Sequence, residues 1–345
     1  MSEEQYALHA AAKDEEWPAG MPSVVVAFDA SPEQRRIVES VLDGDASVEY
    51  AHGLSPDQRR EVFSRASVVF SGGSRRGITQ SEYAYMARVG LLQLISAGAN
   101  HLPFADIPEP IVIAGNAGAY ARPMAEHVMA MILALSKDLL GHNQTLRSGT
   151  FDQEPPNRML TGMTAGIIGF GGIGRSTARL LQNFDVNVLA INSSGKSAKA
   201  VGFVGTLDDL ECVLRESDII LLTLPLNKRT TGLLGTKELG WMKPDAILIN
   251  VARGGLIDER ALFEHARANP GFLVGLDVWW DEPFPDGVFS TKYPLLELPN
   301  VLGSPHNSAN VPGIWDEGTR SAALNIKRFL RGDEVTGIVS REDYV

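Results

Sequence analysis

The sequence of 345 residues is long enough for two domains, and its 44% hydrophobic and 21% charged residues are ordinary for a globular protein. No apolar run reaches the length of a membrane span, and a formal net charge of −11 argues against nucleic acid or an acidic membrane surface as the main partner, because both are polyanions. The acidic, polar start of the chain lacks the pattern of a secretory signal, so a cytoplasmic protein is expected. Cys212 lies in an apolar helical run and is expected to be a packed thiol without chemistry.

Residues 1–22 are acidic and polar and are expected to form a loose leader. After them, short apolar strands alternate with helices. The expected strands are residues 23–28, 47–50, 67–70, 91–95 and 111–114, and the expected helices are residues 32–42, 56–65 and 80–89. Because such alternation is typical of a parallel, doubly wound sheet, residues 1–115 are predicted to form a flavodoxin-like α/β domain. Its ligands are expected at the carboxyl ends of the strands.

Two loops of small residues follow strands of this domain. They read Ser71-Gly72-Gly73-Ser74-Arg75-Arg76 and Ser96-Ala97-Gly98-Ala99-Asn100. Small residues expose backbone N–H groups, so either loop could hold a carboxylate, but loops of this composition are also simple turns. Composition alone leaves both interpretations open.

An apolar helix is expected at residues 122–140, with Pro123 near its first turn, and a polar, proline-bearing arm at residues 147–163. A helix that is apolar nearly all round must be buried against another surface. The helix and the arm together are predicted to form a dimer contact, with packing inside one chain as the alternative. We therefore expect a homodimer.

Residues 164–194 carry the most specific pattern in the chain. A short buried strand runs into Gly169, Gly171 and Gly174, a helix begins at once, and a second apolar strand ends at Ile191. The first glycine permits the tight turn, the second lets a pyrophosphate approach bare backbone, and the third lets the helix pack on the strand. The anion would sit at the helix N-terminus. This βαβ unit predicts a dinucleotide site rather than a glycine-rich connection without a ligand.

The second strand of this unit is followed by Asn192, where an NAD-preferring site usually places Asp or Glu for the ribose 2′-hydroxyl. Asn192, Ser193 and Ser194 offer neutral donors, and Lys196 offers a cation. This set suits a 2′-phosphate, which a carboxylate would repel. The alternative is a solvated polar turn in an NAD enzyme. NADP is therefore the expected cofactor, with NAD as the alternative.

The alternation of strands and helices resumes after this unit. The expected strands are residues 218–224, 246–251, 272–278 and 301–303, and the expected helices are residues 207–215, 236–241, 258–268 and 316–330. Residues 116–307 are predicted to form a Rossmann domain with a second doubly wound parallel sheet. Residues 308–345 are predicted to return to the first domain, with a cleft between the two domains.

Three polar residues follow apolar strands of the second sheet. Arg253 stands in N-V-A-R-G-G-L-I-D, Glu282 in G-L-D-V-W-W-D-E-P, and His306 in G-S-P-H-N-S. Because the carboxyl ends of parallel strands meet at one edge of a sheet, all three are expected where cofactor and substrate meet. Each alone could be a surface or loop residue. Beside a dinucleotide site, the three together are candidates for an active site.

These segments resemble the D-isomer-specific 2-hydroxyacid dehydrogenase family, whose members include glyoxylate/hydroxypyruvate reductases. The resemblance covers about residues 95–330 and is strongest in G-I-I-G-F-G-G-I-G, T-L-P-L, M-K-P-D-A-I-L-I-N-V-A-R-G-G-L-I-D, G-L-D-V-W-W-D-E-P and S-P-H-N-S. It implies an NAD(P)-dependent oxidoreductase acting on CH–OH groups. In it, Arg253 would bind the substrate carboxylate and carbonyl, His306 would be the proton donor or acceptor, and Glu282 would be its charge partner.

The resemblance also implies binding residues. Ala97, Gly98 and Ala99 match the substrate-binding loop of the family. The residues expected or implied to contact the cofactor are Gly169, Gly171, Gly172, Ile173, Gly174, Asn192, Ser193, Ser194, Lys196, Leu224, Pro225, Thr230, Val251, Ala252, Arg253, Asp277 and His306. The positions that depart from the family pattern, besides Asn192, are Trp279, Trp280 and Trp315. At least one of these tryptophans is expected to be core or interface.

The expected reaction is the reduction of a small 2-oxo acid, such as glyoxylate or hydroxypyruvate, to the D-2-hydroxy acid. The Arg253 guanidinium matches a planar carboxylate, and His306 gives a proton to the carbonyl oxygen as hydride arrives from the nicotinamide. The carboxylate of Glu282 is expected to favour the imidazolium form of His306, which keeps the acid available near neutral pH. Two alternatives stay open: a dinucleotide-sensing binding protein resembling the C-terminal-binding corepressors, and a dehydrogenase of phosphite or a phosphonate.

Overall fold

The computed structural model describes residues 21–72, 77–197, 201–283 and 287–345. The chain divides into two compact units, the first formed by Met1–Ala119 with Pro312–Val345 and the second by Tyr120–Val311. The expected leader up to residue 20 and the loop residues 73–76 lie outside the described residues. None of the described helices is long and apolar enough to cross a membrane.

The described strands of the first unit form a five-stranded parallel sheet. They are β1 (Ser23–Val26), β2 (Ser47–Tyr50), β3 (Val68–Ser71), β4 (Leu91–Leu94) and β5 (Val112–Ala114). They lie in the order β2-β1-β3-β4-β5, and every neighbouring pair is parallel. This is the flavodoxin order of a doubly wound sheet, and it confirms the predicted fold class of this unit.

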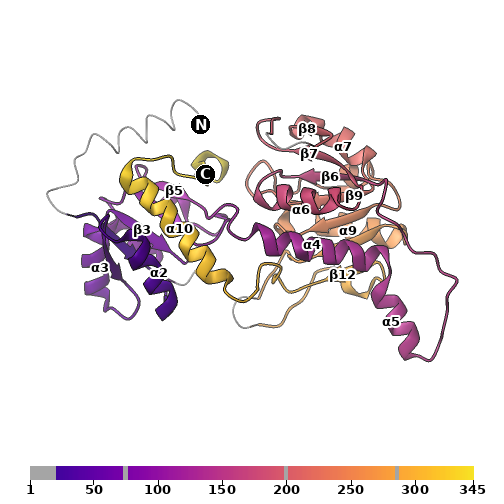
Figure 1. The fold of residues 1–345 in the computed structure, drawn as a ribbon, viewed down its shortest axis with the longest axis horizontal. Helices are drawn as coiled ribbons and strands as arrows, with labels where there is room; N and C mark the ends of the chain where they lie inside the picture. The colour runs from indigo at the N-terminus through magenta and orange to yellow at the C-terminus, as the bar shows by residue number, and fades with distance from the viewer. Residues whose placement is uncertain (1–20, 73–76, 198–200, 284–286) are drawn as a thin grey trace. The chain divides into compact units, whose positions relative to one another are not determined.

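Helices cover both faces of this sheet, because alternate strand residues point to opposite faces. The helices are α2 (Pro32–Leu42), α3 (Pro56–Arg65) and α10 (Ile314–Arg331). Val24 and Val26 share a core with α2 and α10, whereas Val25 and Val69 share one with α3. Helix α10 lies beside α2 (Figure 1), so the last long helix of the chain completes the first unit.

The sequence marks the starts of α2 and α3 with the same signal. Ser31 and Ser55 precede Pro32 and Pro56, and each serine hydroxyl accepts the backbone N–H of the residue three places on. A glutamine at that place accepts the serine N–H in return, which completes a capping box. Because these signals are local, both helices have the bounds predicted for them.

The described strands of the second unit form a seven-stranded parallel sheet. They are β6 (Thr164–Ile168), β7 (Asn187–Ile191), β8 (Phe203–Gly205), β9 (Ile219–Leu222), β10 (Ile247–Asn250), β11 (Leu273–Leu276) and β12 (Val301–Gly303). Their order is β12-β11-β10-β9-β6-β7-β8. The direction of the order reverses at β6, as in a Rossmann fold, and this confirms the predicted fold class of the second unit.

Helices also cover both faces of the second sheet. The helices of this unit are α4 (Ala121–Ser136), α5 (Leu139–Arg147), α6 (Gly172–Gln182), α7 (Leu210–Glu216), α8 (Thr236–Leu239) and α9 (Glu259–Ala268), and α5 buries none of its residues on the sheet. Helix α4 packs with α6 on one face, where Val128 and Ile132 share a core with strand β6. Helices α7 and α9 pack on the other face through Leu214 and Leu262. The apolar surface of α4 is therefore used, at least in part, within its own unit.

The apolar helix expected at residues 122–140 is shorter than predicted. It ends at Ser136, and α5 occupies the start of the segment that follows. The break lies at Asp138, whose φ of 41° is left-handed and whose carboxylate accepts the backbone N–H of Gly141 as a new N-cap. Hydrophobic periodicity does not reveal such a cap, because apolar residues continue across it.

The helix predicted at residues 80–89 is also shorter in the structure and is not an α-helix. A short 3-10 helix, η1, spans Gln80–Tyr85 instead. The carboxylate of Glu82 turns back to accept the N–H of Thr79 at 2.7 Å and lies 2.5 Å from the guanidinium of Arg59. These contacts cap the start of the helix and do not set its end. The N–H of Met86 bonds to the carbonyl of Tyr83 and that of Val89 to the carbonyl of Met86, both at 3.1 Å, so the chain continues in turns closed three residues back instead of an α-helix.

Two further features differ from the predictions. Strand β8 was not predicted, since it is a three-residue edge strand in which only Gly205 is buried. Cys212 is exposed rather than packed, with its Sγ 3.4 Å from Glu216 Oε1. It stands on the solvent side of α7, where the helix period places it away from Val213 and Leu214.

A cluster of charges links the end of α2 to α10. Arg331 donates to both oxygens of Asp45, at 2.8 and 3.1 Å, and the Lys327 ammonium lies 2.9 Å from the same carboxylate. These hydrogen bonds, first that of Arg331 and then that of Lys327, lower the pKa of Asp45 to about 2. The folded state therefore prefers the charged carboxylate more strongly than the unfolded chain does.

We predict that Asp45→Asn lowers the free energy of unfolding at pH 6. Because the pKa of Asp45 is depressed in the folded state, its contribution is present above the unfolded value of about 4 and is lost as pH falls toward 2. Urea unfolding of both proteins at several pH values checks this. If the difference between their free energies of unfolding did not become smaller below pH 4, the stabilising role of charged Asp45 would be contradicted.

Candidate active site

Three glycines shape the turn between β6 and α6. Gly169 has φ 105°, and a Cβ there would lie 2.6 Å from the backbone N of Leu224. A Cβ on Gly174 would lie 2.6 Å from the carbonyl oxygen of Gly169, whereas a Cβ on Gly171 would meet nothing within 4 Å. Packing therefore requires two of the glycines, and the third leaves open space at the N-terminus of α6.

This open backbone fits the pyrophosphate of a dinucleotide. Gly171 is the N-cap of α6, and no side chain caps the helix there. The N–H groups of the first turn of the helix, among them those of Gly172 and Ile173, have no acceptor within the helix. The dipole of this eleven-residue helix favours an anion at the same place. The residues present thus fit the cofactor that the glycine pattern predicts.

Asn192, directly after β7, uses its side chain within its own turn. Its Oδ1 accepts the backbone N–H of Ser194 at 3.0 Å and of Gly195 at 2.7 Å, and its Nδ2 donates to the carbonyl of Lys196 at 2.8 Å. The amide oxygen and one amide N–H are therefore engaged inside the loop. Ser193 and Lys196 are exposed, and residues 192–197 contain no carboxylate.

The ends of β10, β11 and β12 lie side by side. Asn250 is paired with Leu276, and Leu276 with Gly303, across parallel strands. The residues that follow each strand therefore emerge at one edge of the sheet. Arg253 comes three residues after β10, and His306 three residues after β12. The sheet thus gathers residues that are far apart in the sequence.

His306 and Glu282 form a hydrogen-bonded pair. His306 Nδ1 lies 2.8 Å from Glu282 Oε2, and Glu282 Oε1 accepts the backbone N–H of Trp279 at 3.0 Å. Burial would raise the pKa of Glu282, but the hydrogen bond and charge of His306, with the Trp279 N–H and the charge of Arg253, lower it below its usual value. The charged carboxylate accepts a hydrogen bond from Nδ1–H. Nε2 is therefore the ring nitrogen that can contact another partner.

An apolar pocket of about 350 Å³ adjoins this pair. Its lining residues are Trp279, Glu282, Pro283, Phe289, Leu296, Gly303, Ser304, Pro305 and His306. Arg253 is close enough for its charge to act on Glu282, and its Nη1 donates to the carbonyl of Ala252 at 2.6 Å. A guanidinium, an imidazole and a carboxylate in one region can bind a small carboxylate and move one proton.

Asp277, expected to line the cofactor path, is fully buried at the end of β11. It accepts the hydroxyl of Ser304 at 2.5 Å and the backbone N–H groups of Asn307 and Ser308 at 3.1 Å each. His127 of α4 joins this group, with its Nε2 3.0 Å from the Ser304 hydroxyl. Sequence reasoning missed His127, whose sole signal is that it is a polar residue within an apolar helix.

The remaining expected cofactor positions surround the same sheet edge. Leu224, Thr230, Val251 and Ala252 are buried, and Pro225 is exposed. The Thr230 hydroxyl donates to the carbonyl of Pro225 at 2.7 Å and accepts the N–H of Asn227 at 2.9 Å. Thr230 therefore shapes the turn after β9.

The three unusual tryptophans have different surroundings. Trp279 is buried, and its indole N–H donates to the carbonyl of Ser304 at 2.9 Å. Trp280 donates to the carbonyl of Ile257 at 2.6 Å. Trp315 is 54% exposed at the start of α10. Trp279 thus belongs to the core, as expected of at least one of them.

The first unit has a pocket of its own at the carboxyl ends of its strands. It measures about 880 Å³, and its lining includes Asp29, His52, Arg59, Thr79 and Trp315. The expected substrate loop, Ala97, Gly98 and Ala99, follows β4 in this same unit, and there the Ser96 hydroxyl donates to the carbonyl of Gly98. The other expected site residues belong to the second unit.

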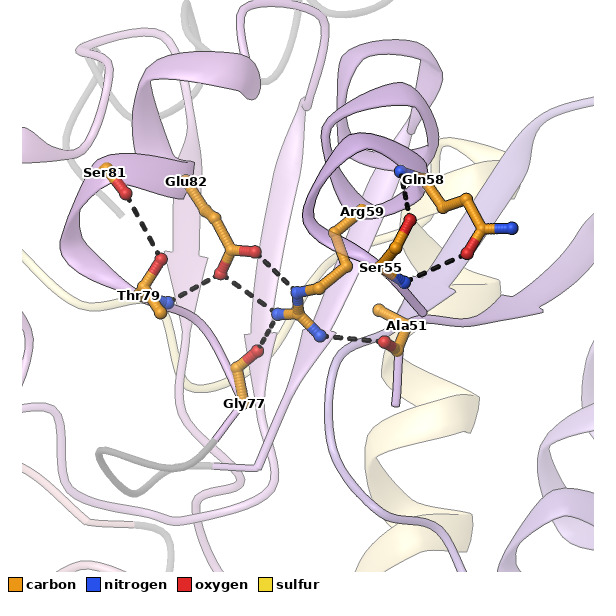
Figure 2. A network of polar contacts seen from close by, with 8 residues as sticks. All are labelled: Ala51, Ser55, Gln58, Arg59, Gly77, Thr79, Ser81 and Glu82. Carbon is orange, nitrogen blue, oxygen red and sulfur yellow. Dashed lines mark hydrogen bonds and ion pairs between the residues drawn. The ribbon is translucent and has the colours of Figure 1, made fainter. Parts of the chain in front are cut away.

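Arg59 lines this pocket and is held by a network of polar contacts, which Figure 2 shows. Its guanidinium donates to both oxygens of Glu82, to the carbonyl of Ala51 at 2.8 Å and to the carbonyl of Gly77. Burial would raise the pKa of Glu82, but Arg59 and the Thr79 N–H lower it, so the pair stays charged. Because the guanidinium is held on three sides, it acts as a structural clamp.

Comparison with known proteins places the second unit in a family. Residues 129–308 match the family model described as D-isomer specific 2-hydroxyacid dehydrogenase, NAD binding domain. The match spans the glycine turn, Arg253, Glu282 and His306.

Individual relatives agree with this match. The chain is 30% identical to a glyoxylate reductase of Thermofilum pendens over 264 residues, which is 73% of this chain and 75% of that protein. It is 29% identical to a D-3-phosphoglycerate dehydrogenase of Methanocaldococcus jannaschii over 305 residues, covering 87% of this chain but 56% of the relative. The solved structure of a glycerate dehydrogenase related protein of Thermoplasma acidophilum is similar at 28% identity, with a TM-score of 0.59, over 89% of this chain and 99% of that one.

The glycine turn gives a paired prediction. Gly174→Ala gains up to about 1 kcal/mol of helix propensity, but the forced contact with the carbonyl of Gly169 costs about 1–3 kcal/mol, so the free energy of unfolding falls. Gly171→Ala meets no atom, so it costs only the preference of an N-cap for glycine over alanine, less than about 1 kcal/mol, but it weakens NADPH binding because its methyl group occupies the open space. Urea unfolding and NADPH fluorescence titration check the pair. Equal Kd values for Gly171→Ala and wild type would exclude this turn as the pyrophosphate site.

Proposed function

The chain belongs to the D-isomer specific 2-hydroxyacid dehydrogenase family, and on that premise we propose that it reduces a small 2-oxo acid to the D-2-hydroxy acid. It is an NAD(P)-dependent oxidoreductase with an NAD-binding Rossmann domain. Because the match covers about half of some relatives, such as the phosphoglycerate dehydrogenases, the substrate is part of the proposal. Glyoxylate and hydroxypyruvate are the proposed substrates.

The observation that carries the proposal is the hydrogen bond between His306 Nδ1 and Glu282 Oε2 at 2.8 Å. The carboxylate that binds His306 is itself held by the backbone N–H of Trp279, so the ring has one defined orientation. A solvated loop histidine does not need such a partner. The pair leaves Nε2 to hold the exchangeable proton, which is the arrangement that a general acid needs.

In the proposed mechanism, Arg253 binds and orients the substrate. Its guanidinium matches the planar carboxylate of a 2-oxo acid with two parallel N–H groups, and its positive charge polarises the adjacent carbonyl. When bound, the reduced nicotinamide supplies the hydride. The apolar walls near His306, among them Trp279 and Pro305, limit the access of water.

His306 moves the proton. Its Nε2 donates to the carbonyl oxygen as that oxygen gains negative charge, and the same nitrogen takes the proton back from the hydroxyl in the reverse direction. Glu282 accepts the hydrogen bond of Nδ1–H and so holds the ring with Nε2 available to exchange a proton with the substrate oxygen.

We also propose that NADP is preferred over NAD. The strand end that would carry a carboxylate for the ribose 2′-hydroxyl carries Asn192, and exposed Ser193 and Lys196 lie in the same turn. A 2′-phosphate would meet a hydroxyl and a cation there and no negative charge.

The remaining expectations stay predictions. A homodimer contact is supported by exposed apolar side chains on and after α5, among them Leu139, Leu140, Leu146 and Phe151. Light scattering from the purified protein would test it. The substrate-binding role of Ala97, Gly98 and Ala99 and the cytoplasmic location are likewise untested.

The reaction is tested by following oxidation of NADPH and, separately, NADH with glyoxylate, hydroxypyruvate and phenylpyruvate. We expect turnover in wild type, and loss of at least about 100-fold in kcat for His306→Ala and Glu282→Gln, since each removes part of the general acid. His142→Ala on α5 is the matched control and should behave as wild type. Tight NADPH binding without turnover of any of these acids would reject the proposed reaction.

Cofactor choice is tested by Asn192→Asp. The aspartate oxygen can still accept the N–H groups of Ser194 and Gly195, so the turn is kept, but the new carboxylate repels a 2′-phosphate. We expect kcat/KM for NADPH to fall about tenfold or more while that for NADH holds or rises. A wild type that already prefers NADH would overturn the assignment of NADP, without affecting the reaction itself.

A further inference from the structure

We propose that His127 and Ser304 are positioning residues that act through Asp277 to hold the backbone of His306 in its working conformation. This inference rests on the proposed role of His306. It assigns a task to a histidine on α4 that the mechanism does not otherwise use. The three side chains form a chain of hydrogen bonds that ends on the two residues after His306. Asp277 is fully buried in it, and His127 and Ser304 are partly exposed.

The first step is the set of contacts around Asp277. This carboxylate is fully buried, and one oxygen accepts both the Ser304 hydroxyl at 2.5 Å and the Asn307 N–H at 3.1 Å. The other oxygen accepts the Ser308 N–H at 3.1 Å. A buried carboxylate needs such donors to stay charged. Asp277 thus fixes the direction of the chain immediately after His306.

The second step is the direction of the hydrogen bonds. The Ser304 hydroxyl has one proton, and the short 2.5 Å distance places it toward the carboxylate of Asp277. Its oxygen is then an acceptor toward His127 Nε2 at 3.0 Å. His127 therefore donates from Nε2, with the same nitrogen 3.8 Å from Asp277. The chain runs from imidazole N–H to hydroxyl to carboxylate, and each group has a defined role.

The third step is the conformation that these contacts maintain. His306 has φ 51°, in the left-handed region that non-glycine residues rarely adopt. Such a conformation is unfavourable for a residue with a Cβ and persists where surrounding contacts determine it. Asp277 fixes the backbone after His306, and the Trp279 indole fixes the carbonyl of Ser304 before it. Glu282 holds the ring itself, so backbone and ring are held by different carboxylates.

The segment also offers a matched control. Ser304 and Ser308 both lie close to Asp277, but the Ser308 hydroxyl is buried without a hydrogen-bond partner in the described structure. Only the backbone N–H of Ser308 bonds to Asp277, and Ser308→Ala keeps this group. Ser304→Ala and Ser308→Ala therefore remove the same atom on one segment, and only the first breaks the proposed chain.

We would determine crystal structures of the unliganded wild type, Ser304→Ala and Ser308→Ala, and measure kcat, KM, the Kd for NADPH and unfolding in urea. For Ser304→Ala we expect His306 to leave φ near 51°, the distance to Glu282 to lengthen, and kcat to fall about 100-fold. The Kd for NADPH should stay within about twofold. Ser308→Ala should match wild type in every readout.

His127 is tested by two variants. His127→Gln keeps an N–H donor near the position of Nε2 and should retain kcat within a few fold. In His127→Leu, kcat should fall as far as it does in Ser304→Ala. Wild-type geometry and kcat in Ser304→Ala would overturn the inference, as would a loss confined to NADPH affinity or to stability. If wild type turns over none of the acids, the proposed function fails, and the His306 conformation in the variant crystals still decides the inference.

Discussion

The site depends on one constraint, the alignment of parallel strands at a common edge of the second sheet. Asn250, Leu276 and Gly303 are neighbours across β10, β11 and β12, so the pairing of the strands itself brings together the residues that follow them. Strand β10 is buried and β11 nearly so, which fixes their register against slippage, and β12 is partly buried at the edge of the sheet. Loops at this edge can therefore carry unusual conformations, such as that of His306, on a rigid base.

Two carboxylates at this edge differ in role because their surroundings differ. Asp277 is sealed from solvent and surrounded by a hydroxyl and two backbone N–H groups, so it serves as a fixed anchor. Glu282 is partly exposed, faces a pocket and is paired with a histidine, so it orients the ring that would exchange a proton with the substrate. Burial is costly for both carboxylates, and each is stabilised by its own donors. One carboxylate thus holds the backbone beside His306, and the other holds its ring.

Much of this could be predicted, and the failures have physical causes. Local signals such as Ser31 with Pro32 set helix bounds, and buried strands such as β10 and β11 are long apolar runs, so element type and both sheet classes followed from sequence. The helix break at Asp138 depends on a single side chain that binds nearby backbone, and the 3-10 helix at Gln80–Tyr85 depends on hydrogen bonds closed three residues back; periodicity reports neither. His127 was invisible because its partners, Ser304 and Asp277, lie at least 150 residues away and meet it only in the folded sheet.

The central claim, that a hydride passes to a 2-oxo acid in this protein, is tested most directly by isotope transfer. NADPH carrying deuterium at the transferable position of the nicotinamide would be incubated with the enzyme and glyoxylate or hydroxypyruvate, and the product examined by mass spectrometry and NMR. The account predicts one deuterium at C2 of the 2-hydroxy acid, with the D configuration where C2 is chiral. A hydroxy acid without deuterium, or an unchanged 2-oxo acid in the presence of bound cofactor, would contradict it.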